Sequence, residues 1–315
     1  MDNELITMNE VNVTYPGGNI ALQDVNLTLR KGTICGLVGV NGAGKSTLFK
    51  AIMGFEKPSN GQIHIAGGDV KKALKRNIIA YVPQTEDVDW DFPILVEDVV
   101  MTGRYGHMGF LRLASAKDHK AVDEALERVD MLSYRKRQIG ELSGGQKKRV
   151  FVARALAQSA EIILLDEPFT GVDIKTEDSL TKLFRDLTDN GTFVFVSTHN
   201  LGSIPRFCDE VVLLNRTILA HGPVETTYSQ ENLIKTFGGK LRHHQLFGHV
   251  LHDDADTRGV TVLTDDERPL VLYGEHDDQK IVRIPRQGTP QKTESTSISH
   301  NDKEKAPMED KNSQK

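Results

Sequence analysis

Residues 33–46 constrain the fold more than any other stretch of the chain. Thr33–Val38 is apolar on both faces, which is typical of a central strand in a parallel sheet. It runs directly into the glycine-rich segment Gly39-x-x-x-x-Gly44-Lys45-Ser46, and a helical pattern with Leu48 and Ile52 on one face follows. This strand, loop and helix order is the context of a phosphate-binding P-loop. The dinucleotide fingerprint is excluded, because its glycine spacing does not fit glycines at 39, 42 and 44.

Each position of this loop has an expected role. Glycines allow the backbone N–H groups to point inward around phosphates, and the helix N-terminus adds a favourable dipole. Lys45 would reach the β- and γ-phosphates, and the Ser46 hydroxyl would take a position on Mg²⁺. The residues predicted to bind the nucleotide here are Gly39, Asn41, Gly42, Gly44, Lys45, Ser46 and Thr47.

Two adjacent acids follow a second apolar run. Ile162–Leu165 predicts a buried strand, and Asp166 and Glu167 stand at its carboxyl end, the edge where ligands collect in open α/β sheets. Because adjacent residues of a strand point to opposite sides, we expect the two acids to have different roles. Asp166 would support Mg²⁺, and Glu167 would orient or deprotonate the attacking water.

A further glycine pair lies between these motifs. Leu142-Ser143-Gly144-Gly145-Gln146 is followed by the strongly helical run Lys147–Gln158. Ser143 and the two glycines therefore stand at a helix start, which offers free N–H groups to an anion. Taken alone, the segment is better explained as an ordinary serine cap.

Composition limits the protein classes that remain. The chain of 315 residues is 38% hydrophobic and has a net charge of −5, which argues against a dedicated nucleic-acid binder. Cys35 and Cys208 are its two cysteines; both are expected in the core, outside any metal-ligand spacing, and so few thiols fit a reducing compartment. Neither a signal peptide at Met1–Glu4 nor an apolar run long enough to span a membrane is expected.

The rest of the pattern indicates strands and helices in alternation. Alternating residues predict two strands near the N-terminus, and apolar runs predict three more besides Thr33–Val38. A helix is expected at 118–129, another around 180–187, and a hairpin at 210–220. The predicted strands are residues 5–13, 21–29, 77–82, 162–165 and 193–197.

With these motifs the sequence resembles the ATP-binding subunit of an ABC transporter, over about residues 5–240. Tyr15 matches the aromatic residue that stacks on adenine. Gln84, which ends Ala-Tyr-Val-Pro-Gln, matches the residue that links Mg²⁺ and the water to the helical subdomain. Asp173 matches the acid that crosses the dimer interface, and His199 the histidine that contacts the γ-phosphate.

The resemblance implies a fold and an assembly. The fold is α/β: a P-loop NTPase core with a mixed sheet, an N-terminal antiparallel β subdomain, and an inserted helical subdomain at about residues 86–145. The cofactors are ATP and Mg²⁺, with Ser46, Gln84 and Asp166 at the metal and Glu167, His199 and Gln84 catalytic. Two copies pair, and residues Leu142, Ser143, Gly144, Gly145 and Gln146 of one copy contact the nucleotide of the other.

The implied partners are integral membrane permease subunits and, indirectly, a periplasmic or lipid-anchored metal-binding protein, without nucleic acid. The chain would then lie at the cytoplasmic face of the inner membrane as a peripheral subunit. Within the family the closest resemblance is to manganese, iron or zinc uptake systems, carried by the segments 99–110, 168–173, 198–203 and 237–243. Importers of iron chelates or cobalamin share part of this pattern, and a soluble, non-transport ABC protein is a further alternative.

Beyond residue 240 the pattern weakens. Residues 241–284 are expected to form an extension with a small hairpin, 260–263 against 270–273, and residues 285–315 a disordered tail. The segment 243–278 is rich in histidine and aspartate, which suits either a divalent-metal site or a solvated polar surface. The residues concerned are His243, His244, His249, His252, His276, Asp253, Asp254, Asp256, Asp277 and Asp278.

Overall fold

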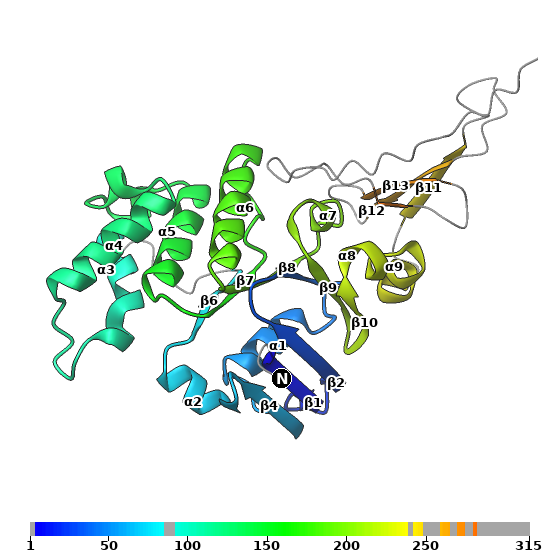
Figure 1. Ribbon diagram of the computed structural model, residues 1–315, viewed down its shortest axis with the longest axis horizontal. Coiled ribbons are helices and arrows are strands. Elements are labelled where there is room, and N and C mark those ends of the chain that lie inside the picture. Colours follow the sequence, from blue (N-terminus) through cyan, green and yellow to red (C-terminus); the bar gives the residue numbers. More distant parts are fainter. Residues whose placement is uncertain are drawn as a thin grey trace, which may run out of the picture. The chain divides into compact units, whose positions relative to one another are not determined.

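A six-stranded mixed sheet carries the predicted strands of the core. The computed structural model describes residues 4–84, 92–238, 242–247, 259–264, 270–274 and 280–281. The strand order is β10-β9-β3-β8-β7-β6, with β10 antiparallel to β9 and the other neighbours parallel (Figure 1). The bounds are β3 (Ile34–Val38), β6 (Ile79–Val82), β7 (Ile162–Asp166), β8 (Phe193–Thr198), β9 (Glu210–Asn215) and β10 (Thr217–Pro223).

The central position of β3 is confirmed. All five of its residues are buried, and it pairs with β8 on one side and β9 on the other. The predicted hairpin at 210–220 is also confirmed, since β9 and β10 pair around Asn215 and Arg216. The strand predicted from Asn77 begins later, at Ile79, because Asn77 has a left-handed φ of 56° that an extended strand does not permit.

A second, antiparallel sheet is built by the N-terminal part of the chain, in the order β2-β1-β4-β5. Strands β1 (Glu4–Thr14) and β2 (Ile20–Arg30) fall where alternation predicts them, whereas β4 (Asn60–Ile65), β5 (Gly68–Asp69) and the helix α2 (Val70–Lys75) were not predicted. The buried residues of this sheet form one apolar cluster with Leu37 of β3 and Leu48 of α1 (Lys45–Ile52). The antiparallel sheet and α1 therefore cover one face of the central sheet.

The other face is covered by helices. The longest is α6 (Ile174–Asp189), whose Leu180, Leu183, Phe184 and Leu187 are buried in a second cluster with Val194 and Val196 of β8. The shorter helices α7 (Ile204–Phe207), α8 (Val224–Thr227) and α9 (Gln230–Phe237) contribute Ile204, Val224 and Leu233 to the same cluster. The central sheet is thus buried on both faces, as its apolar runs predict.

Helices and 3-10 turns between residues 96 and 157 form a helical region. Helices α3 (Val96–Met101), α4 (Ala116–Arg128) and α5 (Gly144–Ala157) pack on one another, joined by the 3-10 turns η1 (Thr102–His107), η2 (Leu132–Tyr134) and η3 (Ile139–Glu141) (Figure 1). A buried ion pair links three of these elements. Arg104 in η1 donates to Asp118 of α4 at 3.0 Å and to the carbonyl oxygen of Ala157 in α5 at 2.8 Å.

Asp118 is held in its charged form. It closes a capping box with Ser115, and hydrogen bonds from the Ser115 hydroxyl and backbone N–H, together with Arg104, lower the pKa of Asp118 to about 2. A paired charge of this kind fixes the relative placement of the helices, because removing either partner would leave the other buried and unpaired.

Near the C-terminus the described residues form a third sheet, β11-β12-β13-β14, which is antiparallel throughout. The predicted hairpin is confirmed in β12 (Gly259–Thr264) and β13 (Leu270–Gly274), whereas β11 (Arg242–Phe247) and β14 (Lys280–Ile281) were not predicted. His243 and His244 lie on β11, opposite Leu263 and Val262. The other members of the His/Asp-rich group and the predicted tail 285–315 lie outside the described residues.

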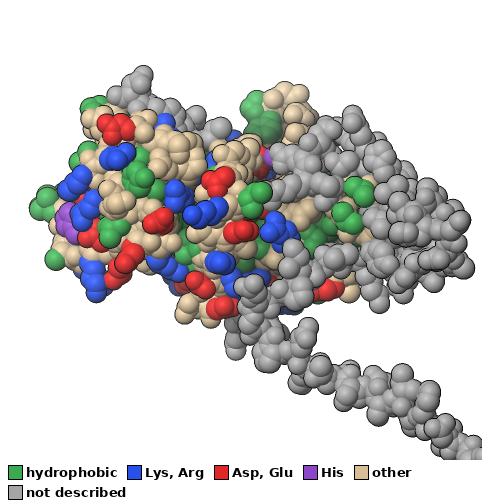
Figure 2. All heavy atoms as spheres, turned by 90° about the horizontal axis from the view of Figure 1, so that it is seen from above, with side chains coloured by type: hydrophobic (Ala, Val, Ile, Leu, Met, Phe, Trp, Pro, Cys, Tyr) green, Lys and Arg blue, Asp and Glu red, His purple; other side chains and the backbone are tan. Residues whose placement is uncertain are grey.

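Two surface properties bear on the chain's surroundings. None of the helices in the described part of the chain has the length and apolar character that crossing a bilayer requires. On the face shown in Figure 2, basic and acidic side chains of the described residues are interspersed rather than separated into regions of one sign.

Gly103 gives a test of how closely the helices pack. A Cβ atom at Gly103 would lie 2.2 Å from the carbonyl oxygen of Arg154 in α5, whereas a Cβ at Gly109 meets nothing within 4 Å. We expect Gly103→Ala to lower the free energy of unfolding by about 1–3 kcal/mol through overpacking. Gly109→Ala should stay within about 0.5 kcal/mol of the parent. Urea unfolding of both variants checks this. If the two variants unfold at the same urea concentration, the contact between η1 and α5 accommodates a methyl group without loss of stability.

Candidate nucleotide site

The glycine loop is shaped by close contacts that exclude side chains. It begins at Gly39, directly after β3, and ends at Gly44, the N-cap of α1, which has a φ of 101°. A Cβ at Gly39 would lie 2.2 Å from the carbonyl oxygen of Leu214 in β9, and one at Gly44 would lie 2.6 Å from the carbonyl oxygen of Ala21 in β2. Both glycines are therefore required by the packing of the loop between β9 and β2.

Lys45 is folded inward over this loop. It is 7% exposed, and its Nζ donates to the carbonyl oxygens of Gly39 at 2.7 Å and Val40 at 3.4 Å. The Tyr15 hydroxyl lies 3.1 Å from Thr47 Oγ1, so the predicted adenine platform meets the loop at its helical end.

A pocket of about 520 Å³ lies over the loop and gathers most of the predicted nucleotide residues. Gly39, the first residue of the loop, is not among the lining residues; its carbonyl oxygen accepts the hydrogen bond from Lys45 Nζ. Arg216, at the β9–β10 turn, also lines the pocket and was missed by sequence reasoning. The predicted residues in the lining are Tyr15, Asn41, Gly42, Gly44, Lys45, Ser46, Thr47, Gln84 and Glu167.

The backbone leaves the extended conformation between Asp166 and Glu167. Asp166 ends β7, is 4% exposed, and accepts hydrogen bonds from the Ser197 hydroxyl and, at 3.5 Å, from the Tyr81 hydroxyl. Glu167 has a φ of 51° and does not continue the strand. We expected the alternation of strand residues to point the two acids to opposite sides. That reason is wrong, because Glu167 is not in the strand; its left-handed conformation sets the direction of its side chain.

Three side chains converge on the Glu167 carboxylate. Gln84 Nε2 donates to Oε2 at 2.6 Å, Thr170 Oγ1 donates to the same oxygen at 3.3 Å, and His199 Nδ1 lies 3.0 Å from Oε1. The contact with His199 is the largest cause that lowers the pKa of Glu167, and the Lys45 charge and the Thr170 hydrogen bond contribute less. Together these interactions outweigh the burial, which raises the pKa. Glu167 is therefore an anion that is held at both oxygens while only 7% exposed.

Lys148 is a second residue that sequence reasoning missed. Its Nζ donates to the carbonyl oxygens of Glu167, at 3.1 Å, and of Thr170. Burial lowers the pKa of Lys148, opposed by the nearby Glu167 charge. Lys148 therefore ties α5 to the backbone turn that sets the Glu167 direction. Its only sequence signal is its place two residues after Gln146.

The predicted metal ligands fit a hard cation. Ser46, Gln84 and Asp166 together line a pocket of about 740 Å³. A hydroxyl, an amide carbonyl and a carboxylate oxygen are the donors that Mg²⁺ prefers, since it takes few protein oxygens and completes its shell with water and phosphate.

The segment Leu142–Gln146 caps a helix, as expected. Ser143 is the N-cap of α5; its Oγ accepts from Gln146 N at 3.3 Å, and Gln146 Oε1 accepts from Ser143 N at 2.9 Å. Leu142 is buried, whereas Ser143 and Gly144 are exposed. Among the described residues that line the pocket over the glycine loop, none comes from this segment.

Asp173 likewise lies outside that pocket. It is exposed and caps α6, accepting from Thr176 N at 2.9 Å and from Thr176 Oγ1 at 2.8 Å. These hydrogen bonds lower the pKa of Asp173, so it is charged. The structure thus brings together the loop, Tyr15, Gln84, Asp166, Glu167 and His199, and leaves the capping segment of α5 and Asp173 free of the pocket in the single chain.

A P-loop beneath a pocket, an acid pair at the sheet edge and a serine-capped helix that begins with two glycines define the class of P-loop ATPases with an ABC cassette. The family model described as "ABC transporter" matches residues 22–170. The chain is 61% identical over 269 residues, 85% of its own length and 91% of the relative, to the chelated iron transport system membrane protein YfeB of Yersinia pestis. It is 58% identical over 244 residues, 77% of its length and 94% of the relative, to the manganese transport system ATP-binding protein MntA of Synechocystis.

Solved structures agree with these matches. A metal-chelate type ABC transporter in an inward-facing conformation has a TM-score of 0.69 at 26% identity, over 85% of this chain and 98% of that one. A dimeric bacterial ABC transporter cassette has a TM-score of 0.60 at 28% identity, over 70% and 99%. The chain belongs to the ABC transporter family and is one of its ATP-hydrolysing, ATP-binding subunits.

The effect of His199 on the charge of Glu167 can be tested. Because the contact with His199 lowers the pKa of Glu167 and burial raises it, His199→Ala should raise the pKa. The carboxylate form would then be lost at a higher pH as the solution is acidified. A titration of ¹³C-glutamate-labelled protein by NMR measures the shift, with the Glu167 signal assigned from Glu167→Gln. Thr170→Val should move the pKa in the same direction by less, and an unchanged pKa in His199→Ala would contradict the assignment.

Proposed function

We propose that the chain energises uptake of a divalent metal ion, manganese, iron or zinc, through membrane permease subunits. The observation that carries the ATPase half of this proposal is the ionised Glu167, held by Gln84 and His199 beside the P-loop pocket. The cargo rests on the relatives, which are named for transport of chelated iron and of manganese. Uptake of an iron chelate is the second candidate, favoured by the words "chelated iron" and "metal-chelate" among the relatives.

In the proposed reaction ATP and water give ADP and phosphate. The N–H groups of the glycine loop and Lys45 would bind the phosphates, and Tyr15 would stack on adenine. Ser46, Gln84 and Asp166 would hold Mg²⁺, which supplies positive charge against the phosphates. Glu167 would orient the attacking water and accept its proton, which requires the ionised carboxylate that His199 favours.

The site is proposed to be completed by a second copy. Ser143 and Gly144 are exposed and Gly145 is half-buried at the start of α5, and none of the three lines the pocket over the glycine loop of their own chain. A helix start of this kind offers backbone N–H groups to a phosphate. The exposed Asp173 would cross the same interface. A solved cassette of the family is dimeric, which supports this arrangement.

Contact with the permease is proposed at the 740 Å³ pocket between α1 and the helical region. Phe55 lines this pocket and is 66% exposed, so its ring would be available to a partner. Gln84 lines both this pocket and the nucleotide pocket, so it would relay nucleotide-dependent movement to the permease. The subunit would then lie at the cytoplasmic face of the membrane, and a periplasmic or lipid-anchored protein would deliver the metal.

We divide the chain accordingly. Residues 5–240 would form the ATP-binding domain, with a helical subdomain at about 86–145. Residues 241–284 would form an extension, of which the described part is the sheet β11–β14.

Glu167→Gln tests the hydrolytic assignment. Glutamine keeps the size of the side chain but cannot accept a proton, so ATP hydrolysis should fall by about a hundredfold or more. The ATP-bound dimer should accumulate, as measured by light scattering after gel filtration, and uptake of radioactive Mn²⁺ into cells carrying the permease should stop. Glu161→Gln, at the exposed ion pair with Lys31, is the matched control. A monomeric Glu167→Gln variant with full activity would refute the two-copy model.

Ser143→Asp separates a capping role from a phosphate role. Aspartate caps helices as well as serine does, so the thermal midpoint should hold, but its charge would repel a phosphate. We expect ATP hydrolysis to fall by about a hundredfold, the usual effect of losing a preorganised oxyanion contact. Ser229→Asp at the exposed cap of α9 should leave both quantities unchanged. If Ser143→Asp hydrolyses ATP normally, α5 is capped for stability alone.

A further inference from the structure

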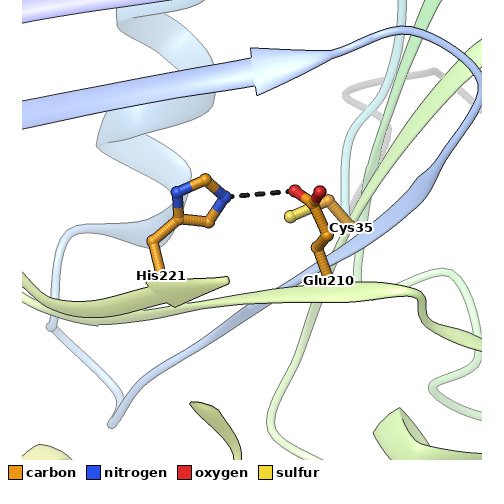
Figure 3. Close-up of side chains that lie close together, drawn as sticks. All are labelled: Cys35, Glu210 and His221. Atoms are coloured by element: carbon orange, nitrogen blue, oxygen red, sulfur yellow. Dashed lines mark hydrogen bonds and ion pairs between the residues drawn. The ribbon is translucent and has the colours of Figure 1, made fainter. Parts of the chain in front are cut away.

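Three metal-ligating side chains meet on one face of the central sheet, away from the nucleotide pocket. Cys35 on β3 is the register partner of Glu210 on β9, and His221 on β10 pairs with Val212, two residues further along β9. Side chains two residues apart share a face, so the register places all three residues on the same side. Figure 3 shows the thiol, the carboxylate and the imidazole directed toward one another.

The distances suit a shared ligand. One ligand atom from each of the three residues lies within 4.8 Å of the others, and His221 Nε2 is 3.2 Å from Glu210 Oε2. In a tetrahedral zinc site the ligand atoms are about 3.4–3.6 Å apart, given the usual metal–ligand bond lengths. The cluster therefore needs only small side-chain rotations to enclose a cation.

The donor set identifies the class of metal. A thiolate, an imidazole and a carboxylate are the three donor types of zinc sites, and related borderline cations accept the same set. Magnesium and calcium bind oxygen donors and are disfavoured by the sulfur. The site therefore differs in chemistry from the oxygen-lined site of Ser46, Gln84 and Asp166.

The cluster is closed to solvent at Cys35 and partly open to solvent at His221 and Glu210. Cys35 is fully buried, whereas the side chains of His221 and Glu210 are 23% and 18% exposed. A metal could enter past the two partly exposed ligands, and its fourth position would face solvent and hold water. Burial, together with neighbouring Cys208 and Glu210, raises the pKa of the Cys35 thiol. Metal binding would thus release a proton.

We propose that Cys35, Glu210 and His221 bind a divalent transition metal of the zinc class, with water as the fourth ligand. The metal–ligand bonds would join β3, β9 and β10 in addition to the backbone hydrogen bonds between these strands. It goes beyond the proposed transport function and does not depend on it.

Co²⁺ is the probe, because a Co²⁺–thiolate bond gives a near-ultraviolet charge-transfer band that oxygen and nitrogen ligands do not give. Both cysteines of the chain precede residue 239, so histidines and aspartates of segment 243–278 cannot produce this band. We expect the full-length protein to bind a single Co²⁺ with the band, and Zn²⁺ to displace it. Binding should also raise the thermal midpoint, since a metal that binds only the folded state stabilises it.

Variants locate the site. Cys35→Ser should abolish the band, and His221→Gln, at a partly exposed position that folding tolerates, should weaken Co²⁺ binding at least tenfold. Cys208→Ser and His64→Gln are matched controls, because Cys208 lies in the cluster on the opposite face and His64 is exposed on β4. Absence of the band in the parent overturns the proposal. So does a band that survives Cys35→Ser or an affinity unaffected by His221→Gln.

Discussion

The site depends on the charge of Glu167 and on the three side chains that hold its carboxylate. These side chains follow different strands: Gln84 comes after β6, His199 after β8, and Thr170 after the turn that leaves β7. A carboxylate that is 7% exposed would ordinarily favour its neutral form. Here these side chains reverse that preference, so the parallel order β8-β7-β6 is a condition for an anion at this position. The strand order of the sheet therefore determines the protonation state of Glu167.

The sequence predicted the parts of this site that follow from local pattern. The apolar runs located β3, β7 and β8, and the spacing of Gly39, Gly44 and Lys45 located the loop. It did not predict β4, β5 or α2, since their short segments carry little periodicity. The reason given for the different roles of Asp166 and Glu167 also failed. A residue after a strand can leave the extended region, and Glu167, with a φ of 51°, donates its N–H to the Ser197 hydroxyl, a contact that the sequence does not reveal.

Contacts between distant strands were the least accessible from sequence. Cys35 was interpreted as a core residue, which its burial supports, but its neighbours Glu210 and His221 are 175 and 186 positions away. Metal-ligand spacing is informative only when the ligands share a local element. Here the register of β3 with β9, and of β9 with β10, brings the three together. Lys148 was missed for the same reason, because its partners lie on the turn after β7.

Strand β3 runs from the proposed metal site to the glycine loop. Its carboxyl end continues into the glycine loop, and its second residue is Cys35. Strand β9 has the same polarity: Glu210 is its first residue, and near its far end the Leu214 carbonyl oxygen lies where a Cβ on Gly39 would fall. A metal on Cys35 and Glu210 would therefore fix β3 against β9 at the end opposite the loop. Gly39 follows β3 directly and packs against β9 with no room for a methyl group. The start of the loop is therefore positioned by the register of these two strands, and whatever holds that register also holds the start of the loop.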